Sequence, residues 1–259
     1  MTYKKIMLTF CLALPLCVAA RIYQIIFTID GVTAFFNIGD ENIGNILTIA
    51  IALVTALIYF IAFKVYKTPK NPPQHNFALT IMSIALAVVL GNEFLHKEFL
   101  PTTQMWQMTM VKILTVLCIA YFLALSLQTI FNFKILPILH IIPVLFAVVQ
   151  TIAYFISISP LAIISDNILL IAAYCFLMVF FINYAKLYNG IDVEYNFKKI
   201  LAAGLGTAIV CITQSAAYII ANFISEKGYP HSDFNTMITI FCFGIFALVF
   251  TISHFRKTA

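Results

Sequence analysis

Eight uninterrupted apolar runs constrain this chain more than any other feature of its sequence. They cover residues 6–29, 44–63, 77–95, 108–131, 137–158, 167–187, 199–223 and 236–255. An α-helix crosses the hydrocarbon core of a bilayer with about 20 apolar residues, so each run is long enough to span it. The runs are continuous rather than alternating, which excludes the strands of a transmembrane barrel. We therefore predict an all-α, polytopic transmembrane helical bundle that forms a single integral membrane domain over residues 1–259.

The composition excludes several classes of function. Only 10% of the 259 residues are charged, whereas 63% are hydrophobic. A soluble domain has about 25% charged residues, and this chain has too few polar side chains to cover a surface in water. Soluble enzymes, nucleic-acid-binding proteins and disordered regulators are excluded, and the expected surroundings are a lipid bilayer.

The distribution of lysine and arginine predicts how the bundle is oriented. Cytoplasmic loops of membrane proteins carry an excess of these cations. Eight spans place most of the 15 cations on one side, and the opposite side receives Lys97 and Lys227. The basic side holds Lys4, Lys5, Lys64, Lys67, Lys70, Lys134, Lys186, Lys198, Lys199, Arg256 and Lys257. Both termini are predicted to be cytoplasmic.

The first apolar run has features of a secretory signal. Lys4 and Lys5 give it a basic start, and residues 18–20 (Val-Ala-Ala) resemble a cleavage site. The apolar stretch nevertheless continues from there to Ile29. We therefore predict an uncleaved first transmembrane helix.

Arg21 is the clearest candidate for a functional residue. It lies inside the first run, nine residues before Asp30. A charged side chain in the middle of a membrane costs about 2.5–3.5 kcal/mol on insertion scales, so such residues are paired or face a hydrated cavity. Glu93 and Asp30 are carboxylates at matching depth and are the predicted partners of Arg21.

Other polar residues fall in the same outer half of the membrane. Gln24 shares a helical face with Arg21, and Lys112 lies about a turn inside the fourth run. In the runs 137–158 and 199–223, polar side chains lie four residues apart on one helical face. They are Gln150 and Tyr154 in the first run and Gln214 and Tyr218 in the second. The predicted ligand-binding pocket, which opens outward, is lined by Arg21, Gln24, Glu93, Lys112, Gln150, Tyr154, Gln214 and Tyr218. The alternative is that the same groups form an ion pair and interhelical hydrogen bonds that only hold the bundle together.

The N-terminal segment also carries a family resemblance. Residues 21–24 (RIYQ), followed by 28–30 (TID) and 33–36 (TAFF), resemble the opening of multi-pass membrane proteins of clostridia-like bacteria that have no assigned activity. Gly31 and Ala34 stand where that pattern often has proline and glycine. The resemblance covers about 16 residues and implies a bacterial cytoplasmic membrane.

Three functions are compatible with these features. The leading hypothesis is a protein that binds or transports a small polar or anionic solute. Arg21 would hold the anionic group, Glu93 would set its charge state, and Gln150 and Gln214 would orient the solute. The first alternative is a non-catalytic membrane sensor or assembly subunit, and the second is an intramembrane lipid-modifying enzyme.

The motifs expected of an enzyme or a metal site are missing or incomplete. The chain has no G-x-S-x-G, no phosphate-binding loop and no H-E-x-x-H. Glu93 and His96 have E-x-x-H spacing, but a metal needs more ligands, and His231 and Asp233 are not fixed at any distance from them. We predict no catalytic residues, no metal site and no cofactor.

Aromatic residues near the ends of the runs fit the belts that mark membrane interfaces. Trp106 and Tyr229 belong to the outer belt on this interpretation. Tyr184, Tyr188 and Tyr195 belong to the inner one.

Overall fold

The computed structural model describes residues 3–30, 36–37, 39–64, 77–96, 104–131, 135–158, 165–191, 193–224 and 233–255. Within them the fold is all-helical. The α-helices are α1 (Tyr3–Tyr23), α2 (Glu41–Phe63), α3 (Phe77–His96), α4 (Met105–Phe131), α5 (Ile142–Ile158), α6 (Ser165–Tyr188), α7 (Val193–Ile224) and α8 (Phe234–Phe255). A π-helical segment, η1 (Gln24–Thr28), continues α1, and a 3-10 turn, η2 (Pro137–Ile141), precedes α5.

Eight helical segments in this part of the chain are long and apolar enough to cross a membrane. The predicted spans agree with them to within a few residues, except that α7 begins six residues earlier than its apolar run, at Val193. The chain is therefore a multi-pass membrane protein. Most of the loop cations that predict the orientation lie outside the described residues, so the cytoplasmic position of the termini stays a prediction.

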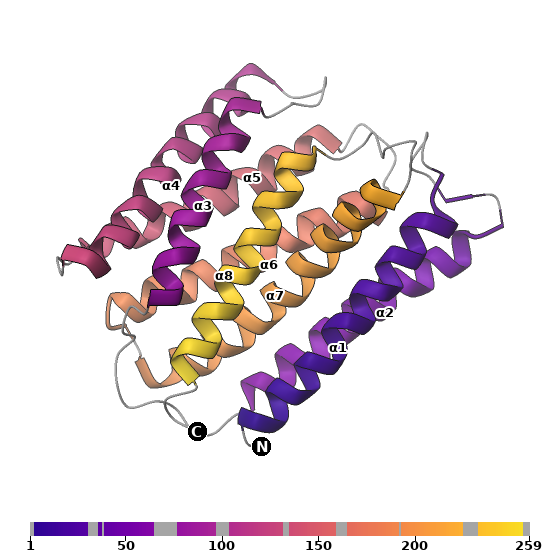
Figure 1. The fold of residues 1–259 in the computed structure, drawn as a ribbon, viewed down its shortest axis with the longest axis horizontal. Coiled ribbons are helices and arrows are strands. Elements are labelled where there is room, and N and C mark those ends of the chain that lie inside the picture. The colour runs from indigo at the N-terminus through magenta and orange to yellow at the C-terminus, as the bar shows by residue number, and fades with distance from the viewer. Residues whose placement is uncertain are drawn as a thin grey trace.

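The helices lie in layers with α7 and α8 in the middle (Figure 1). On one side α1 and α2 form a hairpin that packs against α7. On the other side α3 packs against α4 and α8, and α5 packs against α4 and α6. The helices alternate in direction, so the start of α1 and the end of α8 lie at the same end of the bundle. We call this the terminal end, and we call the opposite end, where α3 finishes and α8 begins, the Glu93 end.

The first apolar run had predicted one transmembrane helix. In the structure this segment is not α-helical throughout. It remains α-helical past Pro15 and changes to π-helix at Gln24. Single π-turns inside helices are rare and occur often at functional sites. Here the change comes directly after Tyr23, within one turn of Arg21.

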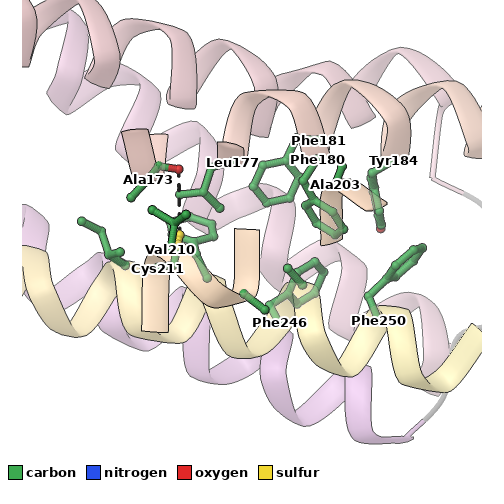
Figure 2. Packing of buried hydrophobic residues seen from close by; sticks show 14 of the residues in the cluster. Ala173, Leu177, Phe180, Phe181, Tyr184, Ala203, Val210, Cys211, Phe246 and Phe250 are labelled. Carbon is green, nitrogen blue, oxygen red and sulfur yellow. Dashed lines mark hydrogen bonds between the residues drawn. The ribbon is translucent and has the colours of Figure 1, made fainter. Parts of the chain in front are cut away.

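Rings of phenylalanine and tyrosine fill the space between α6 and α8. Figure 2 shows Phe180, Phe181 and Tyr184 of α6 facing Phe246 and Phe250 of α8. The ring centroids of Phe180 and Phe250 are 5.8 Å apart, and those of Tyr184 and Phe250 are 5.1 Å apart. Such pairs contribute about 0.5–1.5 kcal/mol beyond the area they bury. Because lipid is as apolar as these side chains, close packing of this kind is what drives helix association in a membrane.

Glycine allows the backbones of α7 and α8 to approach closely. A Cβ atom added at Gly244 of α8 would lie 2.9 Å from the Cβ of Cys211 and 3.3 Å from the backbone nitrogen of Ile212. Neither atom belongs to a flexible side-chain end, so relief would require a shift of the helix. Small residues at helix interfaces of membrane proteins commonly serve this purpose.

We therefore expect Gly244→Ala to destabilise the bundle by about 1–3 kcal/mol, the usual cost of overpacking a well-packed core. The measurement is the thermal unfolding temperature of the purified protein in detergent. Gly91→Ala is the matched control, because a Cβ at Gly91 of α3 meets nothing within 4 Å. Equal unfolding temperatures for the two variants would contradict the close α7–α8 contact.

Candidate functional site

Arg21 is completely buried, with 0% of its surface exposed. Its Nε donates a hydrogen bond of 3.0 Å to Oε1 of Gln214 on α7. Its Nη1 donates to Oε1 of Gln24, three residues further along the chain. Two neutral amide oxygens therefore orient the guanidinium between the first transmembrane segment and α7.

Gln24 connects this arrangement to α2. Its Nε2 donates to the backbone oxygen of Gly44 at 2.7 Å and to Oγ1 of Thr48 at 2.8 Å. Thr28 donates from Oγ1 to the backbone oxygen of Gln24 at 2.7 Å, within the π-helical segment. Gln24 thus uses both ends of its amide and ties the first two transmembrane segments together. We call Arg21, Gln24, Thr48 and Gln214 the arginine cluster.

A second buried polar group surrounds Glu93, which is 1% exposed. Thr236 of α8 places its Oγ1 at 3.3 Å from Oε1 of Glu93 and at 3.1 Å from Oδ2 of Asp233. Oδ1 of Asp233 accepts a 3.0 Å hydrogen bond from the backbone nitrogen of Asn235 at the start of α8. We call Glu93, Asp233 and Thr236 the carboxylate cluster.

The two clusters lie in different layers of the bundle. The arginine cluster is formed by the first two transmembrane segments and α7, and the carboxylate cluster by α3 and the start of α8. The sequence had placed Arg21 and Glu93 in one pocket, with Glu93 as the predicted partner. The hydrogen bonds described for Arg21 run from its guanidinium to two glutamine amide oxygens, and a contact of Arg21 with Glu93 or Asp30 stays a prediction.

The remaining predicted site residues divide among several helices. Tyr218 of α7 and Gln150 of α5 are buried. Tyr154 of α5 stacks on Tyr174 of α6 with ring centroids 5.5 Å apart. Lys112 of α4 is exposed, and its place in the pocket stays a prediction.

Sequence reasoning missed a third polar group, at the terminal end. Tyr121 of α4 has its hydroxyl 2.7 Å from Nδ1 of His140 and 3.4 Å from the hydroxyl of Tyr184. The ring of His140 stacks on that of Tyr188, with centroids 4.7 Å apart. Tyr184 is 1% exposed. Tyr184 therefore faces the interior of the bundle, which the sequence did not predict, because a sequence shows where along a helix a residue lies but not which way it faces.

Two observations bear on metal binding. His96 is exposed whereas Glu93 is buried, so the E-x-x-H spacing does not bring these side chains together, and His231 lies outside the described residues. Among the residues that the structure describes, no group of three or more His, Cys, Asp or Glu is placed to hold a metal ion.

Comparison of the chain with protein-family models, with curated proteins and with solved structures found no match. The resemblance of the N-terminal segment to membrane proteins of clostridia-like bacteria therefore stays a prediction.

The arginine cluster predicts a clear effect of Gln24→Leu. This change removes one acceptor from Arg21 and both links to α2, and leaving a buried donor unsatisfied costs about 1–3 kcal/mol. We expect a lower unfolding temperature in detergent. Thr109→Val is the control, because Thr109 is exposed and its hydroxyl bonds only within α4. An unchanged temperature for Gln24→Leu would contradict the role of Gln24 as a link between helices.

Tyr121→Phe tests the cluster at the terminal end. Loss of the hydroxyl removes the 2.7 Å hydrogen bond to His140, and we expect a loss of about 1 kcal/mol. Tyr59→Phe is the control, since the half-buried ring of Tyr59 packs edge-on against Phe176 and keeps this contact without its hydroxyl. Urea unfolding of the two variants would measure the difference.

Proposed function

We propose that the protein binds a small polar or anionic solute and carries it across the membrane, with the arginine cluster as the binding site. The N-terminal resemblance supports the cytoplasmic membrane of a bacterium as its location. The observation that carries the proposal is a buried donor on Gln214. Nε2 of Gln214 is buried and has no hydrogen-bond partner among the described residues, although Oε1 of the same side chain accepts a hydrogen bond from Arg21.

The unsatisfied Nε2 of Gln214 indicates a missing partner, because buried donors are rarely left without a hydrogen bond. An unmade hydrogen bond of this kind costs about 1–3 kcal/mol, and in native proteins it calls for an explanation such as a bound ligand or water. The donor belongs to the side chain that also holds the guanidinium. An acceptor oxygen of a solute that bound to Nε2 of Gln214 would therefore lie close to the positive charge of Arg21.

The chemistry of arginine favours an anionic group in that position. A guanidinium presents five N–H donors in a planar fork that matches the geometry of a carboxylate or phosphate. An ionisable residue inside a membrane segment is costly and generally marks a substrate path or a paired site. The adjacent π-helical segment is a feature that often accompanies functional sites.

A second candidate, a non-catalytic assembly or sensor subunit, is favoured by a different observation. The amide of Gln24 accepts from Arg21 and donates to Gly44 and Thr48. A residue whose only role is to hold helices together would bond in this way. Under this alternative the arginine cluster is a structural clamp. It would contribute to stability and to no binding event.

Gln214→Glu separates the two candidates. A carboxylate at this position would neutralise Arg21 and remove the amide donor. We expect this variant to lose binding of an anionic solute by at least about tenfold, which is 1.4 kcal/mol, while its unfolding temperature stays equal or rises. Native mass spectrometry of the gently purified protein identifies a retained solute, and a thermal-shift screen of small carboxylates and phosphates tests added ones.

Two further variants complete the experiment. Arg21→Leu should abolish the binding, and Gln128→Glu, which makes the same chemical change near the terminal end of α4, should leave it intact. If no small anion raises the unfolding temperature of the wild type or is retained by it, the transport proposal fails. A loss of stability alone in Arg21→Leu would then favour the structural clamp.

A further inference from the structure

The charged centre of the arginine cluster is buried from solvent. Arg21 and Gln24 are 0% exposed, and Gln214 is 1% exposed. A solute can therefore reach these side chains only if some part of the surrounding protein moves. The shorter way along the first segment leads to the Glu93 end, because Thr28 at the end of η1 lies about 10 Å from Arg21, whereas Tyr3 at the start of α1 lies about 27 Å away.

A small apolar cluster covers this shorter way. It consists of Ile25, Ile29, Phe36, Ala217 and Ala221, which we call the plug. The two isoleucines follow Arg21 by four and eight residues, and the two alanines follow Gln214 by three and seven. Both pairs thus continue the helical faces that carry Arg21 and Gln214, in the direction of the Glu93 end. The plug is separate from the main core of the bundle and closes the arginine cluster on this side.

Phe36 is the member of the plug that comes from the connection between α1 and α2. Its backbone pairs with that of Ile29, and its ring lies so close to Gly44 of α2 that a Cβ atom added at Gly44 would overlap the ring. The backbone oxygen of Gly44 accepts a hydrogen bond from Gln24. The ring therefore covers the point at which the arginine cluster is joined to α2.

Asn37 holds Phe36 in this position. The backbone nitrogen of Asn37 donates to the backbone oxygen of Thr28 at 2.8 Å, and its Nδ2 donates to the backbone oxygen of Phe27 at 3.1 Å. Both oxygens belong to the last residues of η1, where backbone carbonyls find no partner further along a helix. Asn37 thus satisfies the end of the first transmembrane segment and fixes the ring beside it.

The ring can leave its place without unpacking the helices. Phe36 is only half-buried, and the plug is not part of the main core. The turn that leads from Asn37 into α2 is closed by a 3.0 Å hydrogen bond from the backbone nitrogen of Asp40 to the oxygen of Asn37, and Gly39 within it has a φ of 96°. Segments with few buried contacts open at a lower free energy than the core does.

We propose that Phe36 is a gate, and that movement of its ring away from Gly44 admits small anions from the Glu93 end to the arginine cluster. Because α7 contributes alanines to the plug, the ring supplies much of the bulk that faces this helix. The role of the gate in transport rests on the solute binding proposed above. Control of access to the cluster is a property of the fold and is measured separately.

The test measures how fast a thiol placed in the arginine cluster reacts with a small anion. Gln214→Cys supplies the thiol, and lipid nanodiscs leave both faces of the bilayer open. A negatively charged methanethiosulfonate is added, and peptide mass spectrometry follows the labelling at position 214. We expect Phe36→Ala in this background to speed the labelling by at least about tenfold, because a larger share of the molecules then has the cluster open.

Two further variants test the ring itself. Gly44→Ala should also speed the labelling, because the added Cβ displaces the ring while Phe36 is unchanged. Phe36→Leu keeps an apolar side chain in the plug, and its labelling should stay close to the slow rate of the Gln214→Cys background.

Phe223→Ala is the matched control. It removes a phenylalanine ring at the same end of the bundle, on α7, but this ring is 81% exposed, so the labelling should not change. Cys211, which is 0% exposed and lies three residues before Gln214, reports general loosening of the bundle.

The gate is overturned if Phe36→Ala and Phe223→Ala are labelled at equal rates, or if labelling of Cys211 rises together with that of the introduced thiol. Failure of the proposed function has a different signature. In that case no carboxylate or phosphate raises the unfolding temperature of the wild type, whereas the labelling still depends on Phe36.

Discussion

The burial of α7 is the constraint on which the rest of the structure depends. In its membrane-spanning stretch 94% of the residues are buried inside the bundle, against 22% for the first two spans. Helices α1, α2, α6 and α8 all pack on it. A helix surrounded by protein can carry polar side chains that a lipid-facing helix cannot, because their partners are supplied by neighbouring helices rather than by water. The hydrogen bond from Arg21 to Gln214 is made in this setting.

The buried polar residues of this bundle form separate groups. The arginine cluster lies between the first two transmembrane segments and α7, and the carboxylate cluster lies between α3 and α8. The histidine–tyrosine group lies at the terminal end. Each group joins helices that are not neighbours in sequence. Each therefore satisfies the hydrogen bonds of its own polar atoms and also fixes how these helices pack. In a membrane these two roles are difficult to separate, because a buried polar group needs a partner even where it has no other function.

The spans could be predicted from the sequence, whereas the hydrogen-bond partners of Arg21 could be predicted only in part. The positions of the spans could be predicted, because an apolar run of about 20 residues has few alternatives to a membrane helix. That Arg21 has polar partners inside the bundle also followed from its charge and depth alone. Gln24 and Gln214 were correctly placed near it, yet their role as acceptors for Arg21 was not foreseen. Charge suggests a carboxylate as the partner of an arginine, whereas the hydrogen bonds depend on which faces of α1 and α7 meet.

Other features were decided by the tertiary structure alone. The rotation of each helix about its axis leaves Lys112 exposed and Tyr184 buried. Apolar periodicity gives little information on this rotation, because lipid and the protein interior are equally apolar. The convergence of Glu93 and Asp233 on one hydroxyl is likewise a product of α3 packing on α8. The sequence by itself determined that this chain enters the membrane, how many times it can cross and which charge is most costly to bury. Only the packing of the helices decided which polar groups meet, because the partners lie on different helices and chain order does not specify which helices are neighbours.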